Sequence, residues 1–525
     1  MAPNDVGNNI ANPPNNNKVN NANININANN DINANSDANK NHEVKQEHHH
    51  NIDEIAEADA HRTSAELLVS LVIVVSLGAL GGRVAERLRQ PPMLGMLLTG
   101  LFLRNMFRAI IHPIPHAWTT PLWTLALSAV TARAGLSLQT QVMNANLSAT
   151  LLLGIFPVVI EACFLSALIN LIFHMTLPWC FTLSFGVASV SPGVVVPLLL
   201  NLMDRPHWKS SRVPPVLLAA TGLDVLIATT GFGVSLAAIF GHAHELDTSS
   251  AMRVGVAAVP VEEHSSWLAR AVEELFFGFG SGIAVGLFAY FLARRRNHHQ
   301  PQQQQSQQQQ SQQQQHRGRF FVEYDVLSIG AIFMISTAAM MVLKSFGFPG
   351  AASSCVIVCW AIVANVWEKD LVDSANKRLK LVWNFAEPFL FPLIGASVCL
   401  IEIRPIILIL SLLCVFISIC VRMAASFIAA QMAGMSIDEQ IFTSGLWAGK
   451  ASVQAALSTT TIELVYKFKL LNTEADENSR IVFACMVSAI MLGGPFAAAW
   501  VSVFGNQHNS SLAANDHVDR INEKD

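Results

Sequence analysis

The segment at 187–200 reads Val-Ala-Ser-Val-Ser-Pro-Gly-Val-Val-Val-Pro-Leu-Leu-Leu, and it decides the fold that we expect for this chain. Its composition suits a membrane helix, but Ser191, Pro192 and Gly193 interrupt it near its middle. Backbone groups exposed to lipid find no water to bind, so irregular backbone at bilayer depth must line a cavity inside the protein. The segment therefore predicts a broken membrane helix that faces a protein interior.

A second segment of the same kind lies in the other half of the chain. Residues 447–457 read Trp-Ala-Gly-Lys-Ala-Ser-Val-Gln-Ala-Ala-Leu, and they place four polar or helix-breaking residues at bilayer depth, namely Gly449, Lys450, Ser452 and Gln454. Two such interruptions in corresponding positions of two halves indicate a transporter's binding site. We therefore expect two broken helices that cross near the bilayer midplane.

The composition agrees with a protein that lies mostly in a membrane. Hydrophobic residues make up 52% of the chain and charged residues 13%, and long apolar runs recur between Ser64 and Phe504. We predict an all-α polytopic membrane protein with a first transporter half plus a linking helix at 64–294 and a second half at 321–505. Three polar segments have too few apolar residues to form a core and are predicted to be disordered: the Asn-rich tail at 1–63, the Gln-rich loop at 295–320 and the tail at 506–525.

Hydrophobic patterning predicts about thirteen transmembrane helices. They are expected near 65–86, 92–107, 117–136, 147–174, 178–203, 214–241, 267–294, 326–345, 349–366, 383–402, 405–432, 438–463 and 480–504. Lys and Arg gather in the loops of one side, which the positive-inside rule makes cytoplasmic. An odd number of spans then places the Asn-rich tail outside and the C-terminus inside.

The thirteen predicted helices divide into six, one and six. This division puts each interrupted segment in the fifth helix of its half, and it pairs the fourth helices, which carry Glu161 and Arg422. Two six-helix units joined through a single helix enter the membrane in opposite orientations. We therefore predict two inverted repeats with crossed broken helices.

Charged residues deep inside the predicted spans are the candidate ion- and proton-binding residues, namely Asp224, Glu161, Lys450 and Arg422. Each costs about 2.5–3.5 kcal/mol on insertion scales, so each is a functional candidate by default. Asp224 follows the first broken helix among small residues and could take up and release protons as access alternates.

Structural roles compete with functional ones for the other three residues. Glu161 and Arg422 could equally form a buried ion pair that holds two helices together. Lys450 could neutralise the C-terminal dipole ends of the half-helices, pair with Asp224, or itself release a proton.

The remaining polar residues of the spans predict no site. Glu387, Glu273 and Glu274 are interpreted as polar groups that face a cavity or the membrane surface. The eight cysteines lack metal-ligand spacing, and we find no catalytic constellation and no phosphate-binding loop in the sequence. We therefore expect no enzyme activity, no metal, no cofactor and no nucleic-acid partner.

Seven short motifs carry a resemblance to a known family. They are Gln-Pro-Pro-Met-Leu-Gly-Met-Leu-Leu at 90–98, Arg-Ala-Gly-Leu at 133–136, Ile-Glu-Ala-Cys at 160–163, Val-Ser-Pro-Gly-Val-Val-Val-Pro at 190–197, Thr-Gly-Phe at 230–232, Leu-Ile-Gly-Ala at 393–396 and Lys-Ala-Ser-Val-Gln-Ala at 450–455. Over nearly its whole membrane part the chain resembles the NHA branch of the cation/proton antiporters, a group of sodium/proton exchangers. The resemblance implies a homodimer in which a core domain moves like an elevator against a dimerisation domain. It also implies that the four charged candidates occupy core positions of the family.

One position departs from the family pattern. Similar exchangers carry two adjacent aspartates shortly before the Thr-Gly-Phe motif, and the register places the first on Asp224 and the second on Val225. Valine cannot bind Na⁺ or a proton, because a hard cation needs oxygen ligands. The two acids and two bases of this core therefore sum to zero charge, where relatives with both aspartates would have minus one. The Pro that usually precedes the lysine is also replaced, by Gly449.

Three functions are consistent with these residues. The leading hypothesis is a plasma-membrane exchanger of Na⁺ or Li⁺ for H⁺ with Asp224 as the remaining carrier. The neutral core motivates an alternative, proton-coupled transport of an anion such as Cl⁻ with Lys450 and Arg422 as its partners. A third is a non-transporting membrane scaffold, in which the charges only hold the helices together.

Overall fold

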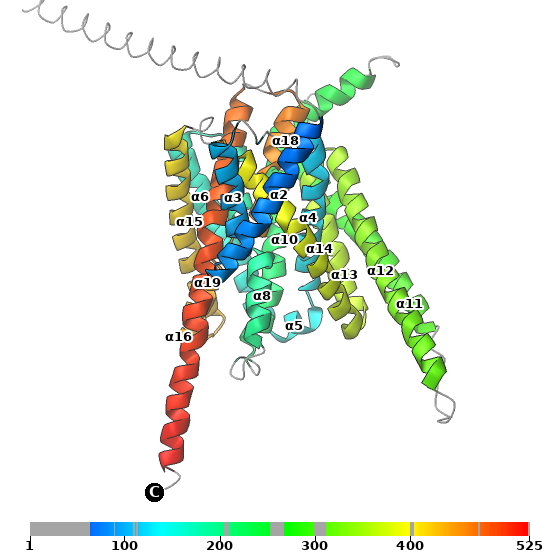
Figure 1. The fold of residues 1–525 in the computed structure, drawn as a ribbon, viewed down its shortest axis with the longest axis vertical. Helices are drawn as coiled ribbons and strands as arrows, with labels where there is room; N and C mark the ends of the chain where they lie inside the picture. The colour runs from blue at the N-terminus through cyan, green and yellow to red at the C-terminus, as the bar shows by residue number, and fades with distance from the viewer. Residues whose placement is uncertain are drawn as a thin grey trace, which may run out of the picture. The chain divides into compact units, whose positions relative to one another are not determined.

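The structure is a computed structural model that describes residues 64–88, 90–108, 111, 114–203, 208, 211–252, 267–298, 311–399, 404–470 and 473–522. Over these residues all regular elements are α-helices, and Leu67–Asp525 belong to one unit (Figure 1). The Asn-rich tail at 1–63 and the part of the Gln-rich loop at 299–310 lie outside the described residues. The prediction of an all-α protein is confirmed.

The helices follow one another along the chain with short connections. They are α2 (Ser64–Arg87), α3 (Pro92–Met106), α4 (His116–Leu136), α5 (Thr140–Ala145), α6 (Leu147–Phe173), α7 (Leu177–Ala188), α8 (Pro192–Met203), α10 (Val213–Met252), α11 (Trp267–His298), α12 (Ser311–Ser345), α13 (Pro349–Val366), α14 (Lys369–Ser397), α15 (Pro405–Met432), α16 (Ile437–Leu446), α17 (Ser452–Ser458), α18 (Thr460–Lys467) and α19 (Glu474–Asn522).

The apolar helices confirm a polytopic membrane protein. Among the described residues, nine segments are long and apolar enough to cross a membrane. The other four predicted spans fall on α3, α4, α14 and the interrupted series α16–α18. Of these, α3 is short at 15 residues and α14 begins with charged residues. The count of thirteen and the inverted repeats stay predictions.

Three helices extend into segments for which the sequence predicted no folded structure. Helix α11 ends at His298 and α12 begins at Ser311, both inside the Gln-rich loop, and α19 continues to Asn522. Gln is a good helix former, so a Gln-rich segment can continue a neighbouring helix without burying an apolar face.

Both predicted interruptions are present. Helix α7 ends at Ala188, Ser189 has the non-helical angles φ −57° and ψ 134°, and α8 starts at Pro192. Proline suits this place because its missing N–H and fixed φ are tolerated in a first helical turn. In the second half, α16 ends at Leu446 and α17 starts at Ser452, after Ala451 with φ −168° and ψ −73°.

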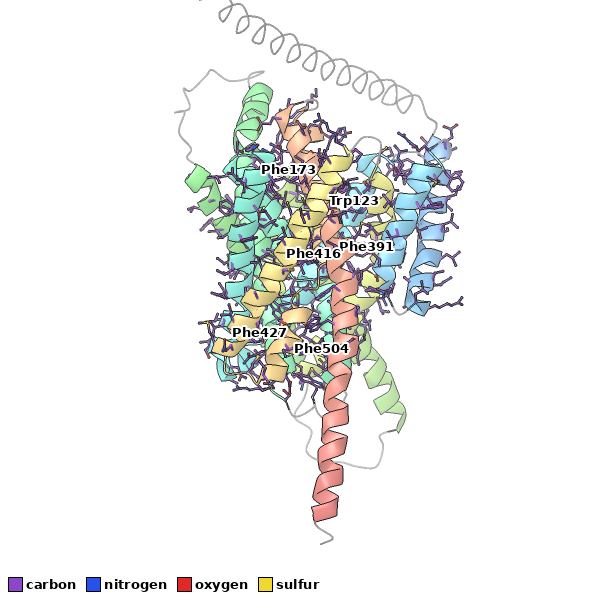
Figure 2. The ribbon with its side chains drawn as sticks, turned by 90° about the vertical axis from the view of Figure 1, so that its left-hand side faces the viewer. Trp123, Phe173, Phe391, Phe416, Phe427 and Phe504 are labelled. Atoms are coloured by element: carbon purple, nitrogen blue, oxygen red, sulfur yellow. The ribbon has the colours of Figure 1, made fainter. Side chains whose placement is uncertain are left out.

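Side chains lie both between the helices and on the outside of the bundle (Figure 2), and many of the exposed ones are large and hydrophobic. Phe391 on α14 is fully buried, whereas Phe416 on α15 is 57% exposed and Phe276 on α11 is 72% exposed. Exposed aromatic and aliphatic residues on long helices are expected where the solvent is lipid.

The central helices pack around the two broken ones. Helix α6 packs against α7, α10 and α15, and α17 packs against α4, α7 and α19. On another side of α10, helix α13 packs against α4, α10, α11 and α12. The fourth helices of the two predicted halves, α6 and α15, are therefore direct neighbours beside the interruptions.

Candidate functional site

The two interruptions contact each other through hydrogen bonds. The backbone N–H of Ser191 donates to the carbonyl of Gly449 at 2.8 Å, and the N–H of Ser452 donates to Oγ of Ser191 at 2.9 Å. The two serine hydroxyls lie 2.8 Å apart, and Ser452 Oγ accepts from the N–H of Gly193 at 3.2 Å. Each break thus supplies partners for backbone groups that the other leaves outside a helix, as buried polar groups require.

Gly193 favours this close approach. A Cβ at this position would lie 3.0 Å from the Cβ and the Oγ of Ser452, which is tighter than ordinary van der Waals contact. Gly449 is similarly enclosed, with Leu446 O and Ala497 Cβ both 3.2 Å from an added Cβ. The predicted set of crossing residues therefore meets at one place.

The four charged candidates from the sequence form one buried cluster beside the crossing. Glu161 on α6, Asp224 on α10, Arg422 on α15 and Lys450 in the second break all have 0% exposure. Nη2 of Arg422 pairs with Oδ2 of Asp224, and Nη1 lies 3.3 Å from Oε2 of Glu161. Nζ of Lys450 lies 2.9 Å from Oε1 and 3.0 Å from Oε2 of Glu161.

The contacts agree with two of the alternatives considered for the sequence, the Glu161–Arg422 pair and Lys450 at the end of a half-helix, and differ from a third. Lys450 pairs with Glu161 where a pairing with Asp224 was one of the options, and Arg422 bridges both acids. Lys450 also donates to the carbonyls of Val187 at 2.8 Å and Ala188 at 3.4 Å. It therefore neutralises the negative C-terminal end of α7 as well as a carboxylate.

Backbone groups and one hydroxyl complete the surroundings of the cluster. Oδ1 of Asp224 accepts from the N–H of Val190 at 2.7 Å, and Nε of Arg422 donates to the carbonyl of Trp447 at 3.3 Å. Ser418 donates to Oε1 of Glu161 at 2.7 Å, a contact that the sequence reasoning missed. The available signal was its spacing, because Ser418 precedes Arg422 by four residues on α15 and so shares its face.

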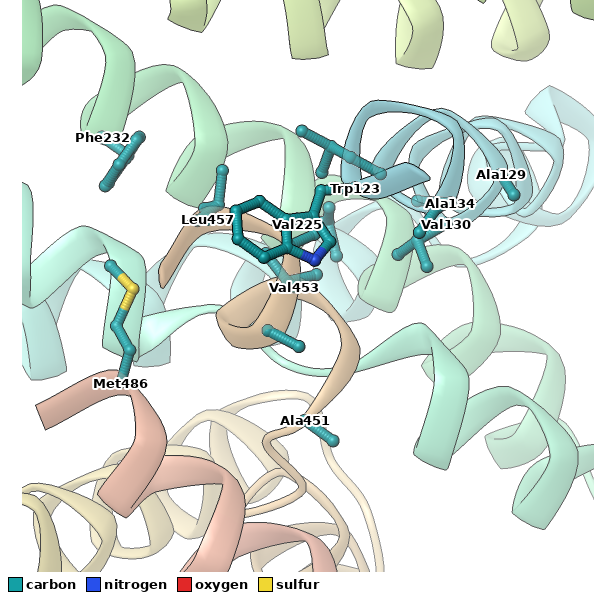
Figure 3. Packing of buried hydrophobic residues seen from close by; sticks show 14 of the residues in the cluster. Trp123, Ala129, Val130, Ala134, Val225, Phe232, Ala451, Val453, Leu457 and Met486 are labelled. Atoms are coloured by element: carbon teal, nitrogen blue, oxygen red, sulfur yellow. The ribbon is translucent and has the colours of Figure 1, made fainter. Parts of the chain in front are cut away.

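Val225 lies next to Asp224 in the chain, and its side chain belongs to a cluster of buried hydrophobic residues. It is fully buried, and Figure 3 shows it among Trp123 on α4 and Val453 and Leu457 on α17. The charged cluster is thus bordered by hydrocarbon at the position where the resemblance implies a second carboxylate.

Glu274, one of the residues interpreted as ordinary polar groups, has a structural contact. It lies on α11 with 2% exposure, and its Oε2 accepts from the N–H of Ala351 in the first turn of α13. A carboxylate there satisfies a free helix N–H and complements the positive dipole end.

Two discontinuous helices that meet beside buried charges, inside a bundle of apolar helices, are typical of secondary membrane transporters. The family model of the transmembrane sodium/hydrogen exchangers matches residues 72–310. Sodium/hydrogen exchanger 9B2 of Mus musculus is 26% identical over 421 residues, which cover 79% of this chain and 68% of that protein. Sodium/hydrogen exchanger 9B1 of Homo sapiens is 24% identical over 451 residues, which cover 83% and 77%.

A solved structure supports the fold. The sodium proton antiporter MjNhaP1 from Methanocaldococcus jannaschii matches with a TM-score of 0.56 and 15% identity, over 84% of this chain and 98% of that chain. The chain is similar to the sodium/hydrogen exchangers in sequence and to MjNhaP1 in fold, and these similarities support an NHA-type cation/proton antiporter. The sodium/hydrogen exchangers are transporters and not enzymes.

Proposed function

We propose that the protein is a monovalent cation/proton antiporter that exchanges Na⁺ or Li⁺ for H⁺, working as a homodimer in the plasma membrane. The names of its relatives, which are sodium/hydrogen exchangers and a sodium proton antiporter, support this assignment. The observation that carries it is the buried cluster of two acids and two bases at the contact of two broken helices.

Asp224 is the proposed carrier because it has fewer bonding partners than Glu161. Among the described residues its contacts come from Arg422 and the N–H of Val190, whereas Glu161 is held by Arg422, Lys450 and Ser418. A hard cation prefers carboxylate oxygens and must displace existing partners to reach them. Fewer partners have to leave Asp224 than Glu161.

The net charge of the cluster couples the binding of a cation to the release of a proton. The four groups sum to zero when all are ionised, and a net charge at 0% exposure is costly. The proton therefore leaves Asp224 when the cation binds: with Asp224 protonated the four groups sum to plus one, and with Asp224 ionised and a monovalent cation bound the sum is again plus one. Exchange of one cation for one proton thus leaves the charge of the buried site the same in both loaded states.

Alternating access requires a moving and a fixed part. We assign the moving part to the broken helices together with α6, α10 and α15, which carry the cluster. Helix α10 meets α13 at a close contact, where a Cβ on Gly233 would lie 2.0 Å from Cα of Gly350 and Thr230 Oγ1 lies 2.9 Å from Ser354 Oγ. This small-residue contact suits two helices that slide past each other in an elevator-type motion.

The anion alternative is favoured by one observation, the neutral cluster with hydrocarbon at Val225. Cl⁻ would then bind at Lys450 and Arg422, with Asp224 or Glu161 as the proton site. The cation assignment leads because the named relatives exchange sodium for protons.

Ion replacement in proteoliposomes separates these functions. With an imposed pH gradient, the proposal predicts dissipation of the gradient on addition of Na⁺ or Li⁺ as gluconate salts, and none on addition of choline chloride. Asp224→Asn should abolish the Na⁺ response, since a neutral amide cannot exchange a cation for a proton.

Each other outcome counts against cation exchange. Dissipation that follows Cl⁻ instead of Na⁺ supports the anion alternative, and no dissipation by folded protein under either condition supports the scaffold. Ser458→Ala is a matched control because Ser458 is fully buried in α17 and donates within its own helix, to Ala455 O.

A further inference from the structure

Gln454 on α17 is a fully buried polar residue beside the charged cluster. Its Nε2 donates to three carbonyl oxygens at the end of α7, those of Ser189 at 2.6 Å, Val187 at 3.1 Å and Gly186 at 3.3 Å. These acceptors fix the orientation of the carboxamide, because turning it over would place Oε1 against the same carbonyl oxygens. The donor end of Gln454 therefore faces the first interruption.

One peptide group joins Gln454 to Asp224. The carbonyl of Ser189 and the N–H of Val190 belong to the same planar unit. Gln454 binds its oxygen at 2.6 Å, and Oδ1 of Asp224 accepts from its N–H at 2.7 Å. Hydrogen bonds at the two ends of one peptide polarise it in the same sense, so each strengthens the other. Gln454 thus orients the peptide whose N–H, that of Val190, donates to Asp224.

Gln454 also meets the second charge pair. The carbonyl of Val187 accepts from Gln454 Nε2 at 3.1 Å and from Lys450 Nζ at 2.8 Å. Lys450 in turn pairs with Glu161. A single carboxamide therefore contacts the peptide that donates to Asp224 and the carbonyl that accepts from Lys450, the partner of Glu161.

The acceptor end of the same side chain is unpaired. Oε1 of Gln454 is buried and has no hydrogen-bond partner among the residues that the structure describes. A buried acceptor without a donor is costly, whereas a dehydrated monovalent cation binds amide oxygen as a ligand. Gln454 thus combines an anchored donor with an available oxygen at the crossing.

We propose that Gln454 is a further residue of the cation site, which positions Asp224 through the Ser189–Val190 peptide and offers Oε1 as a neutral ligand to Na⁺ or Li⁺. The inference rests on the proposed function and adds a residue that sets cation affinity. Loss of the carboxamide should weaken cation binding more than it slows turnover.

The test measures the KM for Na⁺ and for Li⁺ and the maximal exchange rate of the full-length protein in proteoliposomes. Gln454→Leu should raise both KM values at least about tenfold, the effect of losing one hydrogen-bonded ligand, with a smaller change in maximal rate. Gln454→Glu keeps the oxygen ligand but loses the donor to the Ser189 carbonyl, so its KM values should lie between those of the unmodified protein and Gln454→Leu. Ser458→Ala, on the same helix, should keep the KM of the unmodified protein.

A second measurement needs no transport. Na⁺ should raise the Tm of the detergent-solubilised protein and should raise that of Gln454→Leu much less at equal concentration. Equal KM values and equal Na⁺ shifts for Gln454→Leu and the unmodified protein would overturn the role of Gln454 while leaving cation exchange intact. Absence of any Na⁺ effect on the unmodified protein would overturn both. If Gln454→Leu does not fold, Gln454→Met, with a more flexible side chain, provides the same comparison.

Discussion

The two acids of the cluster differ in what surrounds them. Glu161 lies between Lys450, Arg422 and Ser418 and is the anchor of the cluster. Asp224 pairs with Arg422 and accepts a hydrogen bond from one peptide N–H, that of Val190, in the first break. We therefore propose that a carboxylate serves structure at Glu161 and exchange at Asp224, because of the number and kind of its partners.

Lys450→Met tests the structural pair. The substitution leaves Glu161 with one cationic partner in a fully buried place, and breaking such a pair costs about 3–5 kcal/mol. We expect a clear fall in the Tm of the detergent-solubilised protein, measured by thermal unfolding. The double variant Lys450→Met/Glu161→Gln removes both charges of the pair and should recover part of the loss. A double variant with a Tm that falls by the sum of the single effects would show that the two residues do not stabilise each other.

At the scale of elements, the contact between the breaks depends on a few hydrogen bonds. Ser191→Ala removes the acceptor for Ser452 N–H and should cost about 1–3 kcal/mol, since it leaves a buried N–H unpaired. Ser184→Ala is the matched control, because Ser184 is fully buried in α7 and its Oγ has no partner among the described residues. Thermal unfolding should show a lower Tm for Ser191→Ala and an unchanged or higher one for Ser184→Ala. The reverse order would argue that the contact between the breaks does not hold the site together.

Much of this arrangement was predictable from the sequence. Proline and glycine in the first apolar segment, and glycine and lysine in the second, break membrane helices for local reasons that a sequence displays. The gathering of Glu161, Asp224, Arg422 and Lys450 followed from the cost of leaving charges in lipid.

The details depend on how the helices rotate and pack. Which acid Lys450 contacts is decided by the turn of α6 that faces the second break, and the sequence does not encode that turn locally. Ser418 and the peptide between Ser189 and Val190 were missed because a hydroxyl and a backbone group acquire a role only through their neighbours in space. The start of α14 at Lys369, ahead of the apolar run predicted at 383–402, was missed because its first turns are polar.

At the scale of the whole molecule, an apolar exterior surrounds a neutral, fully buried charge cluster. The exterior suits a protein that lies in a membrane. The similarity to the sodium/hydrogen exchangers and to MjNhaP1 supports the fold, and the cluster is the part of the fold where we propose that exchange occurs.

The most direct test is proton release by the purified, detergent-solubilised full-length protein in a weakly buffered solution with a pH-sensitive dye. Addition of Na⁺ gluconate should release protons from the unmodified protein, because the cation takes the place of the proton on Asp224. Choline gluconate should release none, and neither salt should release protons from Asp224→Asn. Equal release from Asp224→Asn on Na⁺ addition, or no release from the folded unmodified protein, would contradict cation/proton exchange at this cluster.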